Sequence, residues 1–166
     1  MSLKDNEKLK QLNAALNALY MEQDDIYSAY AAHFGLSDTA FWILYAVCES
    51  DAVKTQNSLA ALFHMPPQSI NSAVAALVRQ GLVRLEQLPG ARSGKALRLT
   101  EAGEAFCCRV ILPFFAIEEQ AIDTLGEDAA RYVESMRRII AAMRRGVEIA
   151  IRDEKDEHTP TAKEKP

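Results

Sequence analysis

The chain has 166 residues, of which 49% are hydrophobic, and a formal net charge of −4 at pH 7. This length and apolar content suffice for one globular domain with a core, and the acidic balance excludes nucleic-acid binding through overall positive charge. The sequence has no apolar run of roughly 18 residues and no hydrophobic signal segment at its start. We therefore expect a cytoplasmic protein with no membrane partner.

A long first helix is expected at about residues 5–34. Apolar and aromatic side chains recur there at intervals of three and four, which is the spacing of one helix face. They are Leu9, Leu12, Leu16, Leu19, Tyr20, Ile26, Tyr27 and Tyr30. Gly35 ends the pattern, and Ser37 and Asp38 can cap a second helix. The apolar residues of that second helix are Phe41, Trp42, Leu44, Tyr45 and Val47.

The next segment predicts two short helices separated by a proline turn. The first begins near Lys54, with Thr55 as its N-cap. Met65-Pro66-Pro67 breaks it, and Pro67 suits the first turn of the next helix, Gln68 to Gln80. One face of this second helix carries Ile70, Ala73, Val74, Leu77 and Val78. The other carries Gln68, Ser72, Ala75, Ala76 and Arg79, with Ser69 and Asn71 on the flanks.

A β-hairpin follows the glycine at position 81, which suits a helix C-terminus. Residues 82–87 and 95–100 alternate apolar and polar side chains, and the loop between them contains Pro89, Gly90 and Gly94. Helix, turn, helix and hairpin in this order predict a winged helix-turn-helix over about residues 37–100.

The remaining sequence is again helical. Thr100 can cap a helix that runs to about Leu125, with a kink at Pro113, and residues 126–128 form a turn. A last helix is expected at about 129–152, with an apolar stripe of Tyr132, Val133, Met136, Ile139, Ile140, Met143, Val147 and Ile151. Residues 154–166 are charged and almost free of apolar side chains, so we expect a disordered tail.

Positive charge is concentrated in the winged helix-turn-helix. Residues 54–100 hold six basic side chains and one acidic side chain, a net of +5, whereas the rest of the chain holds 13 basic and 22 acidic side chains, a net of −9. A basic patch on an acidic body is what binding to DNA phosphates at one face requires. An ordinary solvated surface is the alternative interpretation.

The sequence offers little that points to catalysis or to a bound metal. Cys48, Cys107 and Cys108 lack metal-ligand spacing, and the histidines at 33, 64 and 158 are scattered. No glycine-rich phosphate loop and no nucleophile–base motif is present. We therefore expect no enzyme activity, no metal and no cofactor. For the cysteines, redox sensing and packing as small apolar residues are both open, and packing is favoured.

In these features the chain resembles the multiple-antibiotic-resistance regulator (MarR) family. The resemblance is carried by Leu36 to Leu44 ahead of the motif, by Thr55-Gln56, by Ile70, Leu77 and Gly81-Leu82-Val83, and by Leu99 to Gly103 at the end of the wing. It implies a mainly α-helical protein with a small β-hairpin wing, a dimeric transcription factor in one domain over residues 1–153. Helices at about 5–34 and 101–152 would form the dimer.

The sequence departs from the family pattern at two positions. The wing has Ala91-Arg92-Ser93 where members commonly have Asp-x-Arg, so Arg92 supplies the cation from the neighbouring position or the loop is offset by one residue. The helix Gln68–Gln80 has Ser72 where members often have arginine. Base contacts would then depend on Gln68, Asn71 and Ser72, since Asn and Gln suit adenine.

Two sets of site residues follow. The DNA-binding residues are predicted to be Thr55, Gln56, Gln68, Ser69, Asn71, Ser72, Arg79, Arg84, Arg92 and Lys95. The resemblance implies a ligand near the junction of the dimer helices and the winged helix-turn-helix. Four aromatic residues could line a pocket there for a small aromatic or apolar effector, although plain core packing is the alternative: Tyr30, Trp42, Tyr45 and Phe114.

The leading functional hypothesis is a homodimeric repressor that binds a palindromic double-stranded operator and is released by a small-molecule effector. The long terminal helices carry more apolar surface than the winged helix-turn-helix can cover, so they pack within one chain or against a second copy. We favour the dimer, because two-fold dimers are common and DNA half-sites match them. The alternative is a winged-helix protein–protein interaction module with weak or no DNA binding, because Ser69, Ser72, Ala75 and Ala76 carry no charge.

Overall fold

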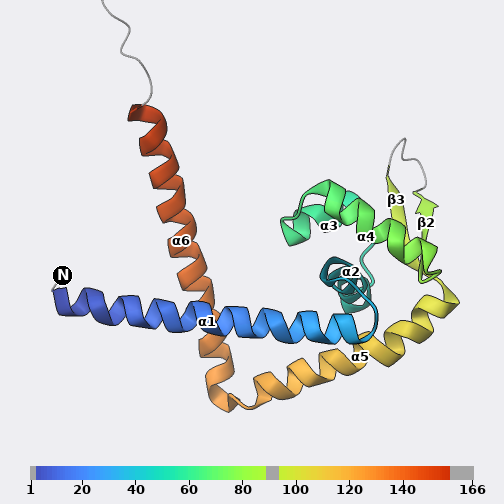
Figure 1. Cartoon of the computed structure of the whole chain (residues 1–166), viewed down its shortest axis with the longest axis horizontal. Coiled ribbons are helices and arrows are strands. Elements are labelled where there is room, and N and C mark those ends of the chain that lie inside the picture. The colour runs from blue at the N-terminus through green and yellow to red at the C-terminus, as the bar shows by residue number, and fades with distance from the viewer. Residues whose placement is uncertain (1–2, 89–93, 158–166) are drawn as a thin grey trace, which may run out of the picture. The chain divides into compact units, whose positions relative to one another are not determined.

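The computed structural model describes residues 3–88 and 94–157 and is mainly helical, with one small sheet (Figure 1). This confirms the predicted fold class. The elements in chain order are α1 (Leu3–His33), α2 (Asp38–Glu49), β1 (Lys54–Thr55), α3 (Gln56–Phe63), α4 (Pro67–Arg79), β2 (Val83–Gln87), β3 (Lys95–Leu99), α5 (Glu101–Asp123), the 3-10 helix η1 (Gly126–Asp128) and α6 (Ala129–Glu157). No helix in the described ranges is long and apolar enough to cross a membrane.

Contacts divide the chain into two compact units, Met1–Phe115 and Ala116–Pro166. The first unit holds α1 to β3 and the beginning of α5, and the second holds the end of α5, η1 and α6. The boundary therefore lies inside α5 and not in a loop. The single domain expected over residues 1–153 stays a prediction.

The hydrophobic core of the first unit lies where α2, α3, α4, the sheet and the first turns of α5 meet. Its largest fully buried side chains include Phe41 and Leu44 of α2, Leu77 of α4 and Ile111 of α5. Burying a side chain of this size stabilises the fold by about 1.5–3 kcal/mol. Only the last two turns of α1 reach this core, through Tyr27, Tyr30 and Ala31. The core therefore holds the winged helix-turn-helix together largely without the N-terminal half of α1.

The sheet has three antiparallel strands in the order β1-β3-β2, one more than the sequence predicts. Lys54 pairs with Leu97 and Thr55 with Ala96, so Lys54 and Thr55 are strand residues and α3 begins only at Gln56. Lys54 is therefore a strand residue and not part of the helix, although Thr55 is the N-cap that the sequence predicts. A two-residue strand is stabilised by its partner strand and not by its own sequence, which explains why periodicity does not reveal it.

The caps and joints of the first unit agree with the sequence signals. The Ser37 hydroxyl accepts a hydrogen bond from the Ala40 N–H at 3.3 Å, as expected of a helix N-cap. The Thr100 hydroxyl accepts from the Gly103 N–H at 3.0 Å and donates to the Gly81 carbonyl at 2.5 Å, which joins the start of α5 to the end of α4. A Cβ at Gly103 would lie 1.9 Å from the Leu82 carbonyl oxygen, so only glycine fits this joint.

The second unit contains long helix but no core of its own. Among the described residues from 116 to 154, every side chain is exposed or half-buried. The turn expected at residues 126–128 is confirmed as η1. Helix α6 continues to Glu157, beyond the expected end at about residue 152, so the disorder expected from residue 154 is wrong for residues 154–157. The rest of the predicted tail, residues 158–166, lies outside the described residues. Pro113 lies within α5, and the kink expected there stays a prediction.

Candidate nucleic-acid interface

The turn between α3 and α4 is defined by short local contacts. The Thr55 hydroxyl accepts from the Ser58 N–H at 3.1 Å, and the Ser58 hydroxyl accepts from the Thr55 N–H at 2.8 Å, so two otherwise unpaired donors are satisfied. His64 ends α3 in the left-handed region, with φ of 52°, and Pro67 opens α4. These contacts confirm the predicted N-cap and fix where α4 begins.

Helix α4 has one buried face and one exposed face. Ile70, Ala73, Val74 and Leu77 are buried at the predicted helical spacing. Val78, expected with them, is 41% exposed, because it lies at the edge of that face and not over the core. Gln68, Asn71 and Ser72 are exposed on the first turns. The N-terminal half of α4 therefore presents amide and hydroxyl groups away from the core.

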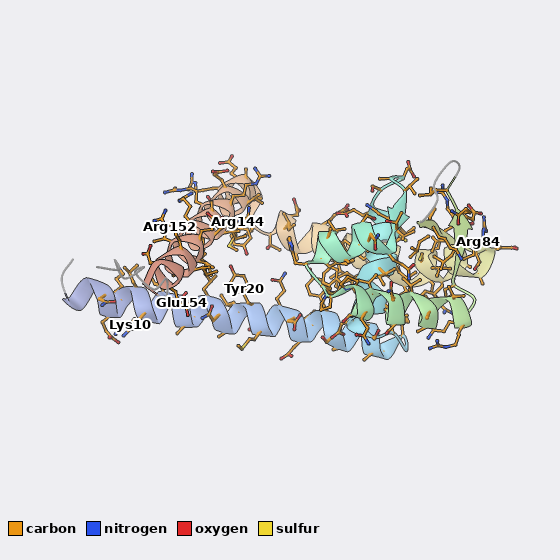
Figure 2. All side chains as sticks on the ribbon, turned by 90° about the horizontal axis from the view of Figure 1, so that it is seen from above. Lys10, Tyr20, Arg84, Arg144, Arg152 and Glu154 are labelled. Atoms are coloured by element: carbon orange, nitrogen blue, oxygen red, sulfur yellow. The ribbon has the colours of Figure 1, made fainter. Side chains whose placement is uncertain are left out.

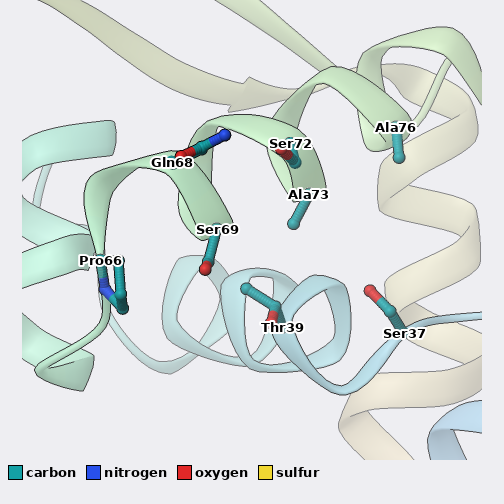
Figure 3. Close-up of a pocket in the computed structure, with 8 residues that line it drawn as sticks. All are labelled: Ser37, Thr39, Pro66, Gln68, Ser69, Ser72, Ala73 and Ala76. Atoms are coloured by element: carbon teal, nitrogen blue, oxygen red, sulfur yellow. The ribbon is translucent and has the colours of Figure 1, made fainter.

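An open groove of about 670 Å³ runs between the exposed side of α4 and the first turn of α2 (Figure 3). Its lining residues are Ser37, Thr39, Pro66, Gln68, Ser69, Ser72, Ala73 and Ala76. Ser69 points down toward the α2 turn that carries Thr39 (Figure 3). Ser69 therefore faces α2, although the sequence predicts it to be a DNA-binding residue. Its contact with DNA stays a prediction.

The two strands of the hairpin bring two arginines together. Arg84 of β2 and Arg98 of β3 are direct partners in the register, and Glu86 lies two residues further along β2. The Glu86 carboxylate lies 2.8 Å from Arg84 Nη2 and 3.6 Å from Arg98 Nε. Arg84 also donates through Nη1 to the Leu99 carbonyl at 3.3 Å. Figure 2 shows Arg84 at the hairpin.

These ion pairs leave the hairpin cations available to another anion. The side chains of Arg84, Arg98 and Glu86 are each 45–57% exposed, and pairs at such exposure contribute only about 0–1 kcal/mol. A phosphate can therefore replace Glu86 at little cost. The ion pairs of Glu86 were not predicted, although the i, i+2 spacing of Arg84 and Glu86 on a strand places both on one face.

The remaining predicted cations and cap residues lie around this surface. Arg79 is exposed at the end of α4, and Lys95 is exposed at the start of β3. Thr55 and Gln56 are half-buried beside β3. Arg92 lies outside the described residues. The structure thus places Arg79, Arg84 and Lys95 on the surface of the helix-turn-helix and hairpin, and their roles toward DNA stay predictions.

The comparisons with known proteins agree with this geometry. Residues 34–92, from the end of α1 to the hairpin loop, match the family model described as the MarR family. Over these residues the chain is similar to the MarR family. The resemblance seen in the sequence is thereby confirmed. No curated protein matches the chain.

Solved structures of transcriptional regulators share the fold beyond the matched segment. The MarR family regulator NMB1585 from Neisseria meningitidis has a TM-score of 0.69 and 19% identity, over 86% of this chain and 98% of that one. The MarR family transcriptional regulator AbsC from Streptomyces coelicolor has a TM-score of 0.66 and 21% identity, over 88% and 98%. The transcriptional regulator BldR from Sulfolobus solfataricus has a TM-score of 0.63 and 21% identity, over 86% and 99%. The fold of this chain is thus that of MarR-family regulators.

In this MarR-type unit the four predicted effector residues lie in one aromatic cluster. The Tyr30 and Phe114 rings are 4.6 Å apart between centroids, and the Trp42 and Tyr45 rings are 5.2 Å apart. Phe41 contacts all four rings. Such distances are those of aromatic pairs in direct contact. The rings therefore fill much of the space that an effector would need.

Tyr30 is also fixed by a polar contact. Its hydroxyl donates to the Val110 carbonyl of α5 at 2.8 Å, and burial raises the pKa of the Tyr30 phenol. This hydrogen bond joins α1 to α5 beside the aromatic cluster. The structure so far supports the core role of these residues, and effector binding stays a prediction.

Proposed function

We propose that this chain is a sequence-specific DNA-binding transcriptional regulator that acts as a homodimer. The observation that carries the proposal is the two-sided α4, whose apolar face is buried while Gln68, Asn71 and Ser72 are exposed on its first turns. In helix-turn-helix proteins the N-terminal residues of the second helix contact base edges in the major groove. A helix held rigidly by its own core and presenting amides at that end is suited to this task.

The charge distribution favours the winged helix-turn-helix as the DNA-binding surface. The net +5 of residues 54–100 lies on a chain whose remainder carries −9, so attraction to DNA phosphates is confined to the winged helix-turn-helix. Arg79, Arg84 and Lys95 are the described cations that we assign to phosphate contacts. Arg92 is assigned to the minor groove on its sequence position alone, since a lone arginine suits the negative potential of a narrow groove.

Base recognition is assigned to α4. Asn and Gln pair in bidentate fashion with adenine, and a good pair of this kind contributes about 1–3 kcal/mol of discrimination. Gln68 and Asn71 are therefore the base-reading residues of the proposal, with Ser72 beside them. The Thr55 hydroxyl already accepts a bond within the α3 cap, so we expect Thr55 and Gln56 to position the backbone and not to select bases.

We assign the binding surface for the second copy of the chain to the exposed apolar side chains of the terminal helices α1 and α6. Large hydrophobic side chains are exposed along both: Leu9, Leu12, Leu19, Met21 and Ile26 in α1, and Tyr132, Val133, Ile139, Ile140, Met143, Val147 and Ile151 in α6. Apolar patches of this extent mark interaction surfaces. A two-fold pair would present two α4 helices to half-sites about one helical turn apart, which gives a palindromic operator.

Repression and release by an effector form the finer part of the proposal. A small aromatic or apolar molecule would bind at Tyr30, Trp42, Tyr45 and Phe114 only by displacing rings that now contact one another. Because α2 supports α4 through the core, moving Trp42 or Tyr45 would shift the base-reading helix. Trp42 is the single tryptophan, so its fluorescence reports such binding directly.

Selection from a pool of random duplexes tests the proposal. We expect enrichment of a palindrome whose affinity falls steeply with salt, as phosphate contacts require. The double variant Gln68→Ala/Asn71→Ala should enrich a degenerate motif, while Gln80→Ala, at the other end of α4, should enrich the same palindrome. No enrichment at low salt, with a protein partner retained on the groove between α2 and α4, would contradict DNA binding and favour a protein interaction module.

A further inference from the structure

A polar hollow of about 400 Å³ is formed by the end of α2, the three strands and the first turn of α5. Three cations line it, one from each strand: Lys54 of β1, Arg84 of β2 and Arg98 of β3. Its volume lies within the range of about 300–1,000 Å³ that is usual for small-molecule sites. All of its lining residues belong to the first unit. The hollow therefore has the size of a ligand site, with positive charge contributed by three strands.

Contacts on the strands hold the three cations in place. Lys54 is half-buried, and its Nζ donates to the Ser50 hydroxyl at 3.2 Å. Arg84 and Arg98 are direct partners in the register of β2 and β3. Both arginines pair with Glu86, but these exposed ion pairs hold them only weakly. The cations can therefore contact a ligand without the loss of a buried ion pair.

Two carboxylates also line the hollow. Asp51 follows α2, and Glu104 lies in the first turn of α5. Among the described residues, neither carboxylate makes an ion pair with a cation of the hollow. Carboxylates accept hydrogen bonds from hydroxyl groups and repel other anions. The occupant that suits this lining has one anionic group for the cations and hydroxyl groups for the carboxylates.

We propose that this hollow binds a small phosphate monoester that carries hydroxyl groups, such as a sugar phosphate. The phosphate of a monoester offers three strong acceptor oxygens, which match three separate cations better than the two oxygens of a carboxylate do. The sugar hydroxyls donate to Asp51 and Glu104. A DNA strand offers the same phosphate group, but its neighbouring phosphates would be repelled by the two carboxylates. A free sugar phosphate therefore suits the hollow better than the DNA backbone.

The hollow is linked to DNA binding through Arg84. The proposed function assigns Arg84 to a DNA phosphate, and a ligand that engages the same guanidinium withdraws it from DNA. Only this link rests on the proposed function. Binding of the sugar phosphate itself is measured without DNA, so the two proposals fail separately.

Isothermal titration calorimetry of the DNA-free full chain with fructose 6-phosphate tests the proposal. We expect saturable binding with a Kd of about 0.1–1 mM, which is reasonable for a ligand of this size. Fructose and inorganic phosphate each supply only part of the contacts. We expect each of them to bind about tenfold more weakly or less.

Charge-removing variants locate the binding. Lys54→Gln and Arg98→Gln each remove one positive charge and keep a polar side chain, and each should weaken fructose 6-phosphate binding by about tenfold. Arg109→Gln is the matched control, because it removes the same charge from an exposed position of α5 outside the hollow. It should bind fructose 6-phosphate as wild type does. Circular dichroism checks that all three variants are folded.

Three results would overturn the proposal. The first is the absence of saturable binding of fructose 6-phosphate to the wild-type chain. If Lys54→Gln then weakens DNA binding, the hollow holds a DNA phosphate instead. The second is equal binding of inorganic phosphate, which would show an adventitious ion only. The third is unchanged binding in both Lys54→Gln and Arg98→Gln.

Discussion

The winged helix-turn-helix and the segment after residue 115 are both mainly helical, yet they bury their side chains very differently. In the first, Phe41, Leu44 and Leu77 are completely or almost completely buried. In the second, no described side chain between residues 116 and 154 is buried, and Ile139 and Met143 are 39% and 66% exposed. Helices gain most of their stability from packing an apolar face. The first region is thus stabilised by its own hydrophobic core. The apolar side chains of the second region need another surface against which they can be buried.

The largest effect is expected at the proposed dimer interface of the second region. Ile139→Glu/Met143→Glu places two charges on the apolar face of α6, and burying unpaired charges at a dimer seam costs several kcal/mol. We expect sedimentation to show monomer or aggregate, with DNA binding lost. Ala130→Glu/Ala141→Glu adds the same charge to the opposite face of α6 and should leave the dimer intact. A dimeric Ile139→Glu/Met143→Glu variant would show that this face is not the interface.

A smaller effect is expected in the core of the first region. Leu44 is fully buried, so Leu44→Ala leaves a cavity and should reduce the free energy of unfolding by about 2–5 kcal/mol. Leu62 of α3 is 52% exposed, and Leu62→Ala should change it by less than about 0.5 kcal/mol. Urea denaturation measures both variants. An equal decrease in the free energy of unfolding in the two variants would contradict the placement of Leu44 in the core and of Leu62 at the surface.

A third prediction concerns the joint between the hairpin region and α5. An added methyl at Gly103 would lie 1.9 Å from the Leu82 carbonyl oxygen, so the backbone must shift. We expect Gly103→Ala to destabilise the chain by about 1–3 kcal/mol, the usual cost of overpacking. Ala102→Ser, at the exposed neighbouring position, is the control and should differ little from wild type in thermal unfolding. A neutral Gly103→Ala would mean that α5 approaches Leu82 less closely.

Signals that act over a few residues were predictable from the sequence. Ser37, Thr55 and Thr100 were identified as helix caps, and each hydroxyl accepts the expected backbone hydrogen bond. Such caps depend only on the residue type and the following turn. The buried face of α4 followed in the same way from helical spacing, apart from Val78 at its edge.

Contacts between distant residues were not predictable in this way. The pairing of Lys54 with Leu97 depends on a strand more than forty residues away, so β1 was read as the beginning of a helix. The hydrogen bond from the Tyr30 hydroxyl to the Val110 carbonyl likewise depends on how α1 and α5 pack. The four aromatic residues proposed to line a pocket lie in one cluster, but whether their rings enclose a pocket or fill it is decided by packing.

Discrimination between specific and scrambled DNA by Asn71→Ala tests the central claim most directly. Affinities of wild type, Asn71→Ala and the control Gln80→Ala are measured for the selected palindrome and for a scrambled duplex at matched salt. If α4 reads bases, Asn71→Ala lowers the affinity for the palindrome by about 1–3 kcal/mol and leaves scrambled DNA unaffected, while Gln80→Ala behaves as wild type. An equal loss on both duplexes, or no loss on either, would contradict base reading by α4.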